Sequence, residues 1–188
     1  PQNEERRMTI KANVPLDAFY KSWHMADRLD KRYYIADLLS EILSGGGSSR
    51  LYQSLVKEKQ LFSNIECHHF GSTDSGLVAI EGKLVKGVKI EEAEKAVEEV
   101  LQGLKDEPVI ETELQKVKNK TESMIAFEDM SVMNRANSLA YYEMLGDAEL
   151  MNKELERYAA VTPQDVLEES RKIFRKENSN TIWYLAEH

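Results

Sequence analysis

The chain has 188 residues, of which 41% are hydrophobic and 31% are charged, enough for one well-buried core and unlike a disordered chain. The mean hydropathy is −0.53, and no apolar stretch approaches the about 20 residues that a bilayer-spanning helix needs, so no membrane span is expected. The net charge is −8, with Lys and Arg dispersed among Glu, which argues against a nucleic-acid partner. The single Cys67 excludes an internal disulfide.

The first part of the chain predicts two strands followed by two helices. Apolar and polar residues alternate over residues 8–14, which predicts a half-buried strand that Pro15 ends. The aromatic-rich residues 19–25 predict a second strand. From Asp30 the apolar residues recur at helical spacing until three glycines at 45–47, which end the predicted helix. Ser48 or Ser49 can then cap a short second helix.

The remainder predicts a hairpin, a block of helices and a last strand. Residues 65–70 and 77–85 are predicted strands, separated by a loop of Gly, Ser and Asp. Thr112 and Gln115 resemble a capping box at the head of a long helix that runs through Met130. Thr162 and Pro163 are expected to be the N-cap and first position of the last helix. Further helices are predicted over residues 93–104, 132–145 and 147–158, and a final strand over 181–185.

This order of elements predicts an α+β fold. Consecutive strands with short connections favour antiparallel pairing, and the helices are grouped instead of alternating with strands. We expect residues 1–188 to form a single domain with an antiparallel, possibly mixed-edge, sheet and helices packed on one face, because each helix has one apolar stripe. The chain begins at Pro1 without an initiator Met, so we expect it to be part of a longer polypeptide.

No self-sufficient active site is evident in the sequence. The four histidines form neither H-E-x-x-H nor its inverse H-x-x-E-H, so no metal centre is expected; they are His24, His68, His69 and His188. His68 and His69 are neighbours in a predicted strand, point to opposite faces and are expected to be ordinary strand residues, and His24 a structural one. Cys67 is expected to be a buried, inert thiol. The glycines at 45–47 fit a helix C-cap better than a phosphate loop.

The stretch ILSGGGSSRLYQSLVKEK at residues 42–59 resembles the signature segment in the C-terminal domain of the pitrilysin/insulinase zinc peptidases, the family that includes mitochondrial processing peptidase. The similarity extends to the strand around Trp23, the helix from Asp30, the strand at 76–85 and the segment VTPQDV at 161–166, in the same order. The resemblance therefore covers nearly the whole chain.

The resemblance implies a ferredoxin-like half-module, one of two similar halves that enclose an unfolded peptide. In that family the first half carries the zinc, held by H-x-x-E-H and a distal Glu, and the motif's Glu is the general base. Nothing in this chain matches those positions. The resemblance thus implies the C-terminal, zinc-free half of a zinc metalloendopeptidase, with no catalytic residue or cofactor of its own and a catalytic H-x-x-E-H half in the same polypeptide or in a partner subunit.

Two residues are candidates for substrate binding by this resemblance. Active family members place an Arg and, seven residues later, a Tyr in the second half, and these positions fall on Lys57 and Asn64, or on Ser63 with a loop one residue shorter. Lys keeps the positive charge without the guanidinium fork, and Asn has a shorter reach than a phenol. An exposed helix-end charge without a substrate role is the alternative for Lys57. Arg50 and Tyr52 are expected to be structural, with Arg50 tying the turn to the sheet.

Two other functions remain open. The chain could be a non-catalytic scaffold or binding subunit of a peptidase-like complex, or an unrelated ligand-binding domain if the motif is accidental. An upstream or neighbouring H-x-x-E-H half favours the peptidase, whereas a partner half that also lacks the motif favours the scaffold. The resemblance is compatible with the bacterial cytoplasm or periplasm.

Overall fold

Five strands form one sheet in the order β1-β5-β2-β4-β3, in a computed structural model that describes residues 2–187. Strands β2, β4 and β3 pair antiparallel with their neighbours, and so does β5 with β2, whereas β1 pairs parallel with β5. The mixed-edge form of the predicted α+β sheet is thus confirmed. The strands are β1 (Arg6–Ala12), β2 (Ala18–Met25), β3 (Phe62–Phe70), β4 (Gly76–Leu84) and β5 (Ser179–Ala186).

The pairing of the first two strands differs from the expectation. The hairpin of β3 and β4 is confirmed, but β1 and β2 do not pair with each other, because β5 lies between them and hydrogen-bonds to both. The connection after Ala12 therefore crosses over the position of β5. A short connection favours antiparallel neighbours only where no third strand competes for the edge.

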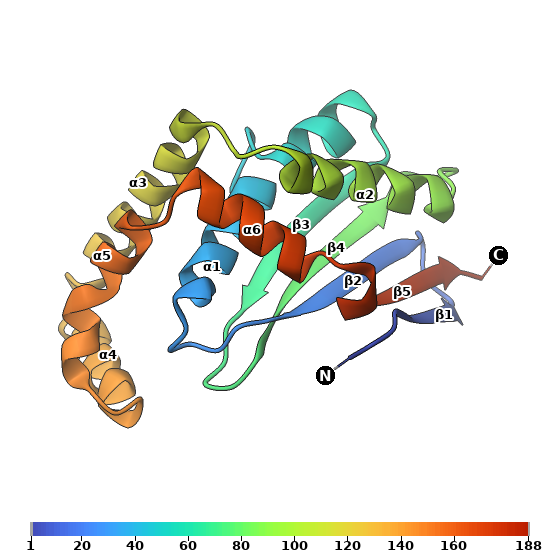
Figure 1. Cartoon of the computed structure of the whole chain (residues 1–188). Helices are drawn as coiled ribbons and strands as arrows, with labels where there is room; N and C mark the ends of the chain where they lie inside the picture. The colour runs from blue at the N-terminus through green and yellow to red at the C-terminus, as the bar shows by residue number, and fades with distance from the viewer. Residues whose placement is uncertain (1, 188) are drawn as a thin grey trace.

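Three helices cover one face of the sheet (Figure 1). Helix α1 (Lys31–Ser44) packs on β3, while α2 (Ile90–Asp106) and α6 (Pro163–Ile173) pack on each other and reach β2. Asp30 caps α1 by accepting a hydrogen bond from the Arg32 amide. The helix ends at Ser44, with Gly45 as its C-cap, and Gly46 follows at a φ of 118°. The helix stop at the glycines is confirmed, since this left-handed conformation favours glycine.

The core lies between this helical layer and the sheet. Phe19, Trp23, Phe62 and Ile80 of the strands are almost fully buried against the apolar stripes of α1 and α2. The alternation of β2 and β4 explains this layer, because every second side chain points toward the helices. Between α1 and β3 lies the π-helical segment η1 (Tyr52–Glu58), the predicted second helix, which buries Leu55.

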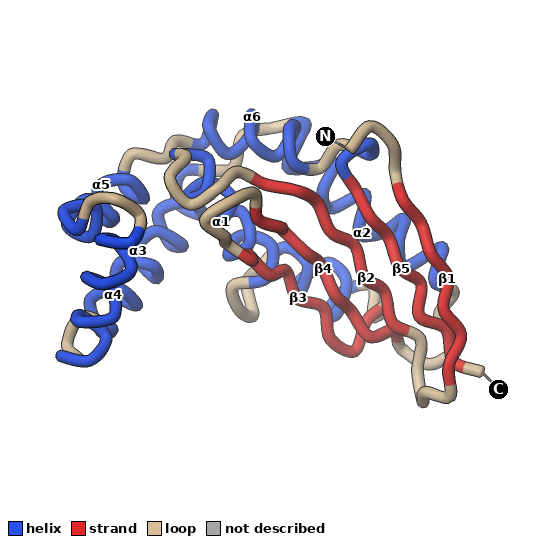
Figure 2. The backbone as a smooth tube through the Cα atoms, turned by 90° about the horizontal axis from the view of Figure 1, so that it is seen from below, coloured by secondary structure: helices blue, strands red, loops and turns tan. Residues whose placement is uncertain are grey.

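The opposite face of the sheet carries no helix, and Figure 2 shows the strands with the helices behind them. We call it the open face. By register it presents Tyr20 of β2, Glu81 of β4 and Glu66 of β3 in one row, continued by Ile182 of β5 and Met8 of β1. Met8 is exposed, so the alternation at residues 8–14 marks an edge strand with an open apolar side and not a half-buried one.

Helices α3 (Glu111–Glu128), α4 (Val132–Met144) and α5 (Glu154–Ala159), with the 3-10 segment η2 (Ala148–Lys153), extend beyond the sheet as an arm (Figure 1). Helices α3 and α5 pack on α1, but α4 buries only Tyr142. The arm leaves large apolar side chains exposed, among them Phe127, Met130 and Met133. No helix of residues 2–187 is sufficiently long and apolar to cross a membrane.

Two helix starts show how far local sequence determines a cap. Thr162 caps α6 with Pro163 at its first position, and a reciprocal pair of hydrogen bonds with Asp165 completes a capping box. The capping box predicted at Thr112 and Gln115 is wrong, because α3 already begins at Glu111 and its N-cap is Ile110. A short 3-10 turn, η3 (Lys176–Asn178), leads from α6 into β5.

Candidate functional site

The predicted substrate-binding residues lie on either side of the turn between η1 and β3. Lys57 is exposed near the end of η1, and Asn64 is exposed near the start of β3. Gln60 adopts a left-handed φ of 53° between them. In the described part of the chain the Lys57 ammonium has no ion-pair partner, whereas the Asn64 amide donates a hydrogen bond to Glu66 Oε1 at 3.2 Å. Ser63 donates to the Lys83 carbonyl instead, at 3.1 Å.

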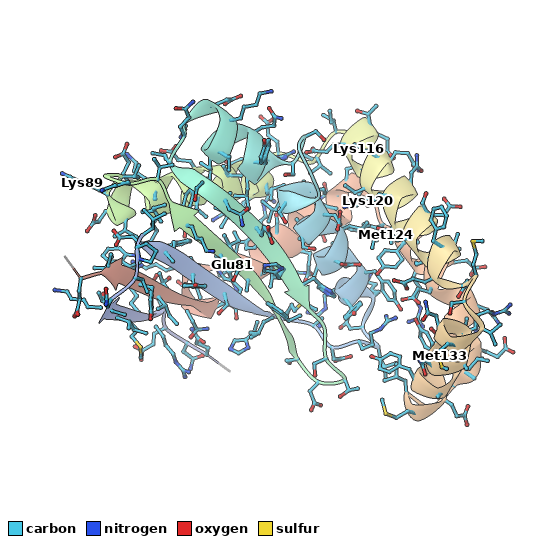
Figure 3. All side chains as sticks on the ribbon, turned by 180° about the vertical axis from the view of Figure 1, so that it is seen from behind. Glu81, Lys89, Lys116, Lys120, Met124 and Met133 are labelled. Atoms are coloured by element: carbon cyan, nitrogen blue, oxygen red, sulfur yellow. The ribbon has the colours of Figure 1, made fainter. Side chains whose placement is uncertain are left out.

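Asn64 is therefore the first member of a polar group on the open face. Glu66 and His68 follow it on alternate positions of β3, and Glu81 comes from β4. His68 Nε2 lies 3.3 Å from Glu81 Oε1 and 3.7 Å from Glu66 Oε2. Figure 3 shows Glu81 in the middle of the sheet, on the side turned away from the helices. This group is the one set of three potential metal-ligating side chains that residues 2–187 bring together.

His69 points to the opposite face from His68, as the strand period predicts. Its ring packs edge-on against Tyr33 at 4.4 Å between centroids, and its Nδ1 lies 3.5 Å from Asp37 Oδ1. Burial lowers the pKa of His69 despite the Asp37 charge, which favours the neutral ring. The histidine belongs to the packing between α1 and β3. His24 is exposed on the open face, so its expected structural role finds no packing there, and His188 lies outside the described residues.

Cys67 and Arg50 have structural surroundings. The Cys67 thiol is buried as predicted, and burial raises its pKa well above the usual value, which disfavours the reactive thiolate. Arg50 forms two hydrogen bonds to the Glu113 carboxylate, from Nε at 3.0 Å and Nη2 at 2.7 Å. Arg50 thus ties the glycine turn to α3 and not to the sheet, as had been expected from the sequence. Tyr52 is 42% exposed.

A charged cavity on the helical side was not predicted from the sequence. It has a volume of about 400 Å³, and Lys21, Trp23, Glu94 and Trp183 are among its lining residues. Lys21 is only 5% exposed, and its ammonium lies 2.5 Å from Glu98 Oε1 and 3.4 Å from Glu94 Oε1. Glu94 also accepts hydrogen bonds from Arg7 and from the indole of Trp183. Arg7, Lys21, Glu94 and Glu98 thus all have ion-pair partners, which gives these four charges a structural role.

The Glu94 cluster predicts acid sensitivity. Burial alone would raise the pKa of Glu94, but the hydrogen bonds from Arg7 and the charge of Lys21 outweigh burial, and the pKa is lowered. A lowered carboxyl pKa contributes stability above its unfolded value of about 4.3, and this contribution is lost as pH falls through the folded pKa. Glu94→Gln should lower the free energy of unfolding by about 1–3 kcal/mol at pH 7.

Urea unfolding between pH 7 and 3 measures this effect. The loss of stability from about pH 5 downward should be steeper in the unmodified chain than in Glu94→Gln. Glu91→Gln is the matched control, because Glu91 lines the same cavity but is exposed. Parallel curves for the unmodified chain and Glu94→Gln would contradict the assignment.

Comparison with known proteins gives the class of the chain. Residues 1–121 match the family profile described as the peptidase M16 inactive domain. The match spans more than half of the chain, so the protein belongs to the peptidase M16 inactive-domain family, as the resemblance at residues 42–59 implied. A search among curated proteins gives no match.

Solved structures share the fold over almost the whole chain. A protease from Helicobacter pylori is 21% identical, with a TM-score of 0.91, and the match covers 98% of this chain and 44% of that one. The inactive peptidase domain of a candidate zinc protease from Bordetella parapertussis is 20% identical, with a TM-score of 0.84 and coverage of 94% and 96%. A chain of complex III2 from Candida albicans is 14% identical, with a TM-score of 0.78 and coverage of 95% and 45%. This chain thus spans less than half of the first and third of these.

Proposed function

We propose that this chain is the C-terminal half of a zinc metalloendopeptidase, the half without the catalytic zinc ligands, and that it forms one wall of the chamber that encloses an unfolded peptide. The observation that carries the proposal is membership of the inactive-domain family by a chain without H-x-x-E-H. Zinc and the general base then belong to the other half, in the same polypeptide or in a partner subunit. One half can supply all of the zinc chemistry, because a single set of protein ligands holds the Zn²⁺ ion and the ion lowers the pKa of its bound water to about 7.

The surfaces of the chain are compatible with this role. The open face presents a mixture of apolar and charged side chains without a covering layer. Lys57 and Asn64 are both exposed at one end of β3, where an ammonium and an amide can bind peptide carbonyls. In the proposed role these two side chains position substrate, and they take no part in bond cleavage.

Reconstitution tests the proposal. The chain is mixed with the H-x-x-E-H half encoded with it, and cleavage of a quenched fluorescent peptide is followed. We expect chelator-sensitive cleavage from the mixture and none from this chain alone. Proteolysis by the isolated chain, inhibited by a chelator, would overturn the proposed division of labour.

The two positioning residues are tested in the same assay. Lys57→Ala and Asn64→Ala should each raise KM several-fold with a smaller change in kcat, because a contact to the substrate backbone is lost. Lys86→Ala, at an exposed lysine beyond β4, is the control for removal of a surface charge. Values of kcat and KM equal to those of the unmodified protein in both variants would remove the substrate role of Lys57 and Asn64.

A non-catalytic scaffold is the second candidate, and one observation favours it. The fold is shared with a chain of complex III2 from Candida albicans, a protein named as part of an assembly. If this chain is a scaffold, the partner half also lacks H-x-x-E-H, and the mixture of the two halves forms a stable complex without cleaving peptide. Sequencing of the adjoining coding region separates the two candidates before any protein is made.

A further inference from the structure

Glu66, His68 and Glu81 converge on the open face for reasons that lie in the sheet geometry. Glu66 and His68 are two residues apart on β3, so their side chains project from the same face. The register of the hairpin places Glu81 directly opposite Glu66, and Ala79 opposite His68. The small Ala79 side chain leaves room for the His68 ring to lean toward Glu81.

The carboxylates of Glu66 and Glu81 lie opposite each other and repel. No Lys or Arg side chain of residues 2–187 forms an ion pair with either of them. Like charges directly opposite each other on neighbouring strands are destabilising. Among residues 2–187, His68 is the one basic side chain within ion-pair distance of either Glu66 or Glu81. The other neighbour of Glu81 in the row is the uncharged Tyr20 of β2. A bound cation would remove the repulsion.

The separations match those of ligands around a tetrahedral metal ion. With metal–ligand bonds of 2.0–2.2 Å, two ligand atoms of a tetrahedral zinc site lie about 3.3–3.6 Å apart. The imidazole nitrogen of His68 lies 3.3 Å and 3.7 Å from its two carboxylate oxygens, and all three potential ligand atoms lie within 4.8 Å of one another. Rotation about the side-chain bonds of two exposed glutamates is sufficient to close the remaining distance.

We propose that Glu66, His68 and Glu81 form a binding site for a divalent transition-metal ion, best suited to Zn²⁺, on the open face of the sheet. One imidazole and two carboxylates are a ligand set typical of zinc, and three protein ligands leave a fourth position for water. Asn64 positions the site, because its amide holds Glu66 Oε1 and leaves Oε2 directed toward His68. His68 and Glu81 also line a recess on this face, together with Tyr20, Phe70 and Ile182 among others.

Calorimetric titration of the tag-free chain with ZnCl₂ in a non-chelating buffer tests the site. We expect one Zn²⁺ per chain, with affinity reduced at least about tenfold in His68→Ala and in Glu81→Gln through loss of a ligand, and by about tenfold in Asn64→Ala through loss of positioning. His24→Ala is the matched control, since His24 is exposed on the same face and has no carboxylate partner among residues 2–187. The zinc affinity of this variant should be unchanged. Mg²⁺ should not compete, because it prefers all-oxygen octahedral sites.

The zinc titration can succeed or fail independently of the proteolysis assay. Stoichiometric zinc binding that is weakened at least about tenfold in His68→Ala supports the site, whether or not the reconstituted protein cleaves peptide. Absence of binding to the unmodified chain, equal affinity in His68→Ala, or equal loss in His24→Ala would overturn it. The visible spectrum of the Co²⁺ complex provides a second readout, because tetrahedral coordination by the three side chains should give intense absorption bands that His68→Ala lacks.

Discussion

Arg28→Met is expected to lower the free energy of unfolding by about 3–5 kcal/mol, because it leaves a mostly buried carboxylate without its cation. Arg28 is 6% exposed and lies where three elements meet. Its Nη1 donates to the Tyr34 hydroxyl of α1 at 2.6 Å, and its Nη2 donates to the Tyr142 hydroxyl of α4 at 2.5 Å and to the Glu154 carboxylate of α5. Methionine has a similar length but can make none of these bonds.

The same contacts explain why the loss of stability in Arg28→Met should be concentrated in the arm. Tyr142 is the only side chain of α4 that is buried, and its hydroxyl donates to Glu154 while it accepts from Arg28. Burial, together with the Glu154 hydrogen bond, raises the pKa of Tyr142, so the phenol keeps its proton. Without Arg28, the arm retains few contacts that hold α4 to the body.

Chemical unfolding measures the loss of overall stability in Arg28→Met, and hydrogen exchange measures the loosening of the arm. Exchange of amides in residues 132–159 should accelerate in Arg28→Met more than exchange in β2 or β4. Arg32→Met is the control, since Arg32 forms an ion pair with Asp30 at an exposed site and should cost less than about 1 kcal/mol. Equal losses of stability in the two variants would mean that the Arg28 network does not hold the arm.

Phe62→Ala is the second variant with a large expected effect. It should lower the free energy of unfolding by about 3–5 kcal/mol through the cavity that it creates. Phe62 is 1% exposed at the start of β3 and meets Phe19 edge-on at 6.5 Å between ring centroids. Its ring lies over Gly82 of β4, so closely that a Cβ at Gly82 would come within 2.6 Å of Cδ1. The glycine and the phenyl ring are therefore two parts of one packing arrangement.

A double-mutant cycle tests this arrangement. Gly82→Ala alone should destabilise by about 1–3 kcal/mol through overpacking, but it should cost little or even stabilise when Phe62→Ala has already removed the ring. Phe70→Ala, at the exposed far end of the same strand, is the control and should cost less than 1 kcal/mol. Additive losses for Gly82→Ala and Phe62→Ala would contradict the packing described here.

Local pattern predicted most elements of this fold. The strands, the helix stop at Gly45, the β3–β4 hairpin and the cap at Thr162 all depend on residues a few positions apart, and all are present. The same kind of reasoning failed at Thr112, because a capping-box pattern does not determine which residue leaves the helical backbone. Motif similarity at residues 42–59 then provided the family.

What could not be predicted depends on contacts between distant residues. The insertion of β5 between β1 and β2 joins segments more than 150 positions apart, and no local signal encodes it. Arg28 meets Tyr142 and Glu154 for the same reason. The Glu66–His68 spacing was visible in the sequence, but only the hairpin register adds Glu81. Considering His68 with His69 alone therefore missed the group.

The central position of β5 has a consequence for biosynthesis. While the polypeptide emerges from the ribosome, α1 and the β2-β4-β3 portion can assemble early, because their contacts are separated by fewer than 70 positions. Strand β1 has no hydrogen-bonding partner until residues 179–186 have been translated, and one edge of β2 is open for the same period. A nascent chain that stalls in α6 thus exposes two unsatisfied strand edges, and this interval is when a chaperone would be needed most.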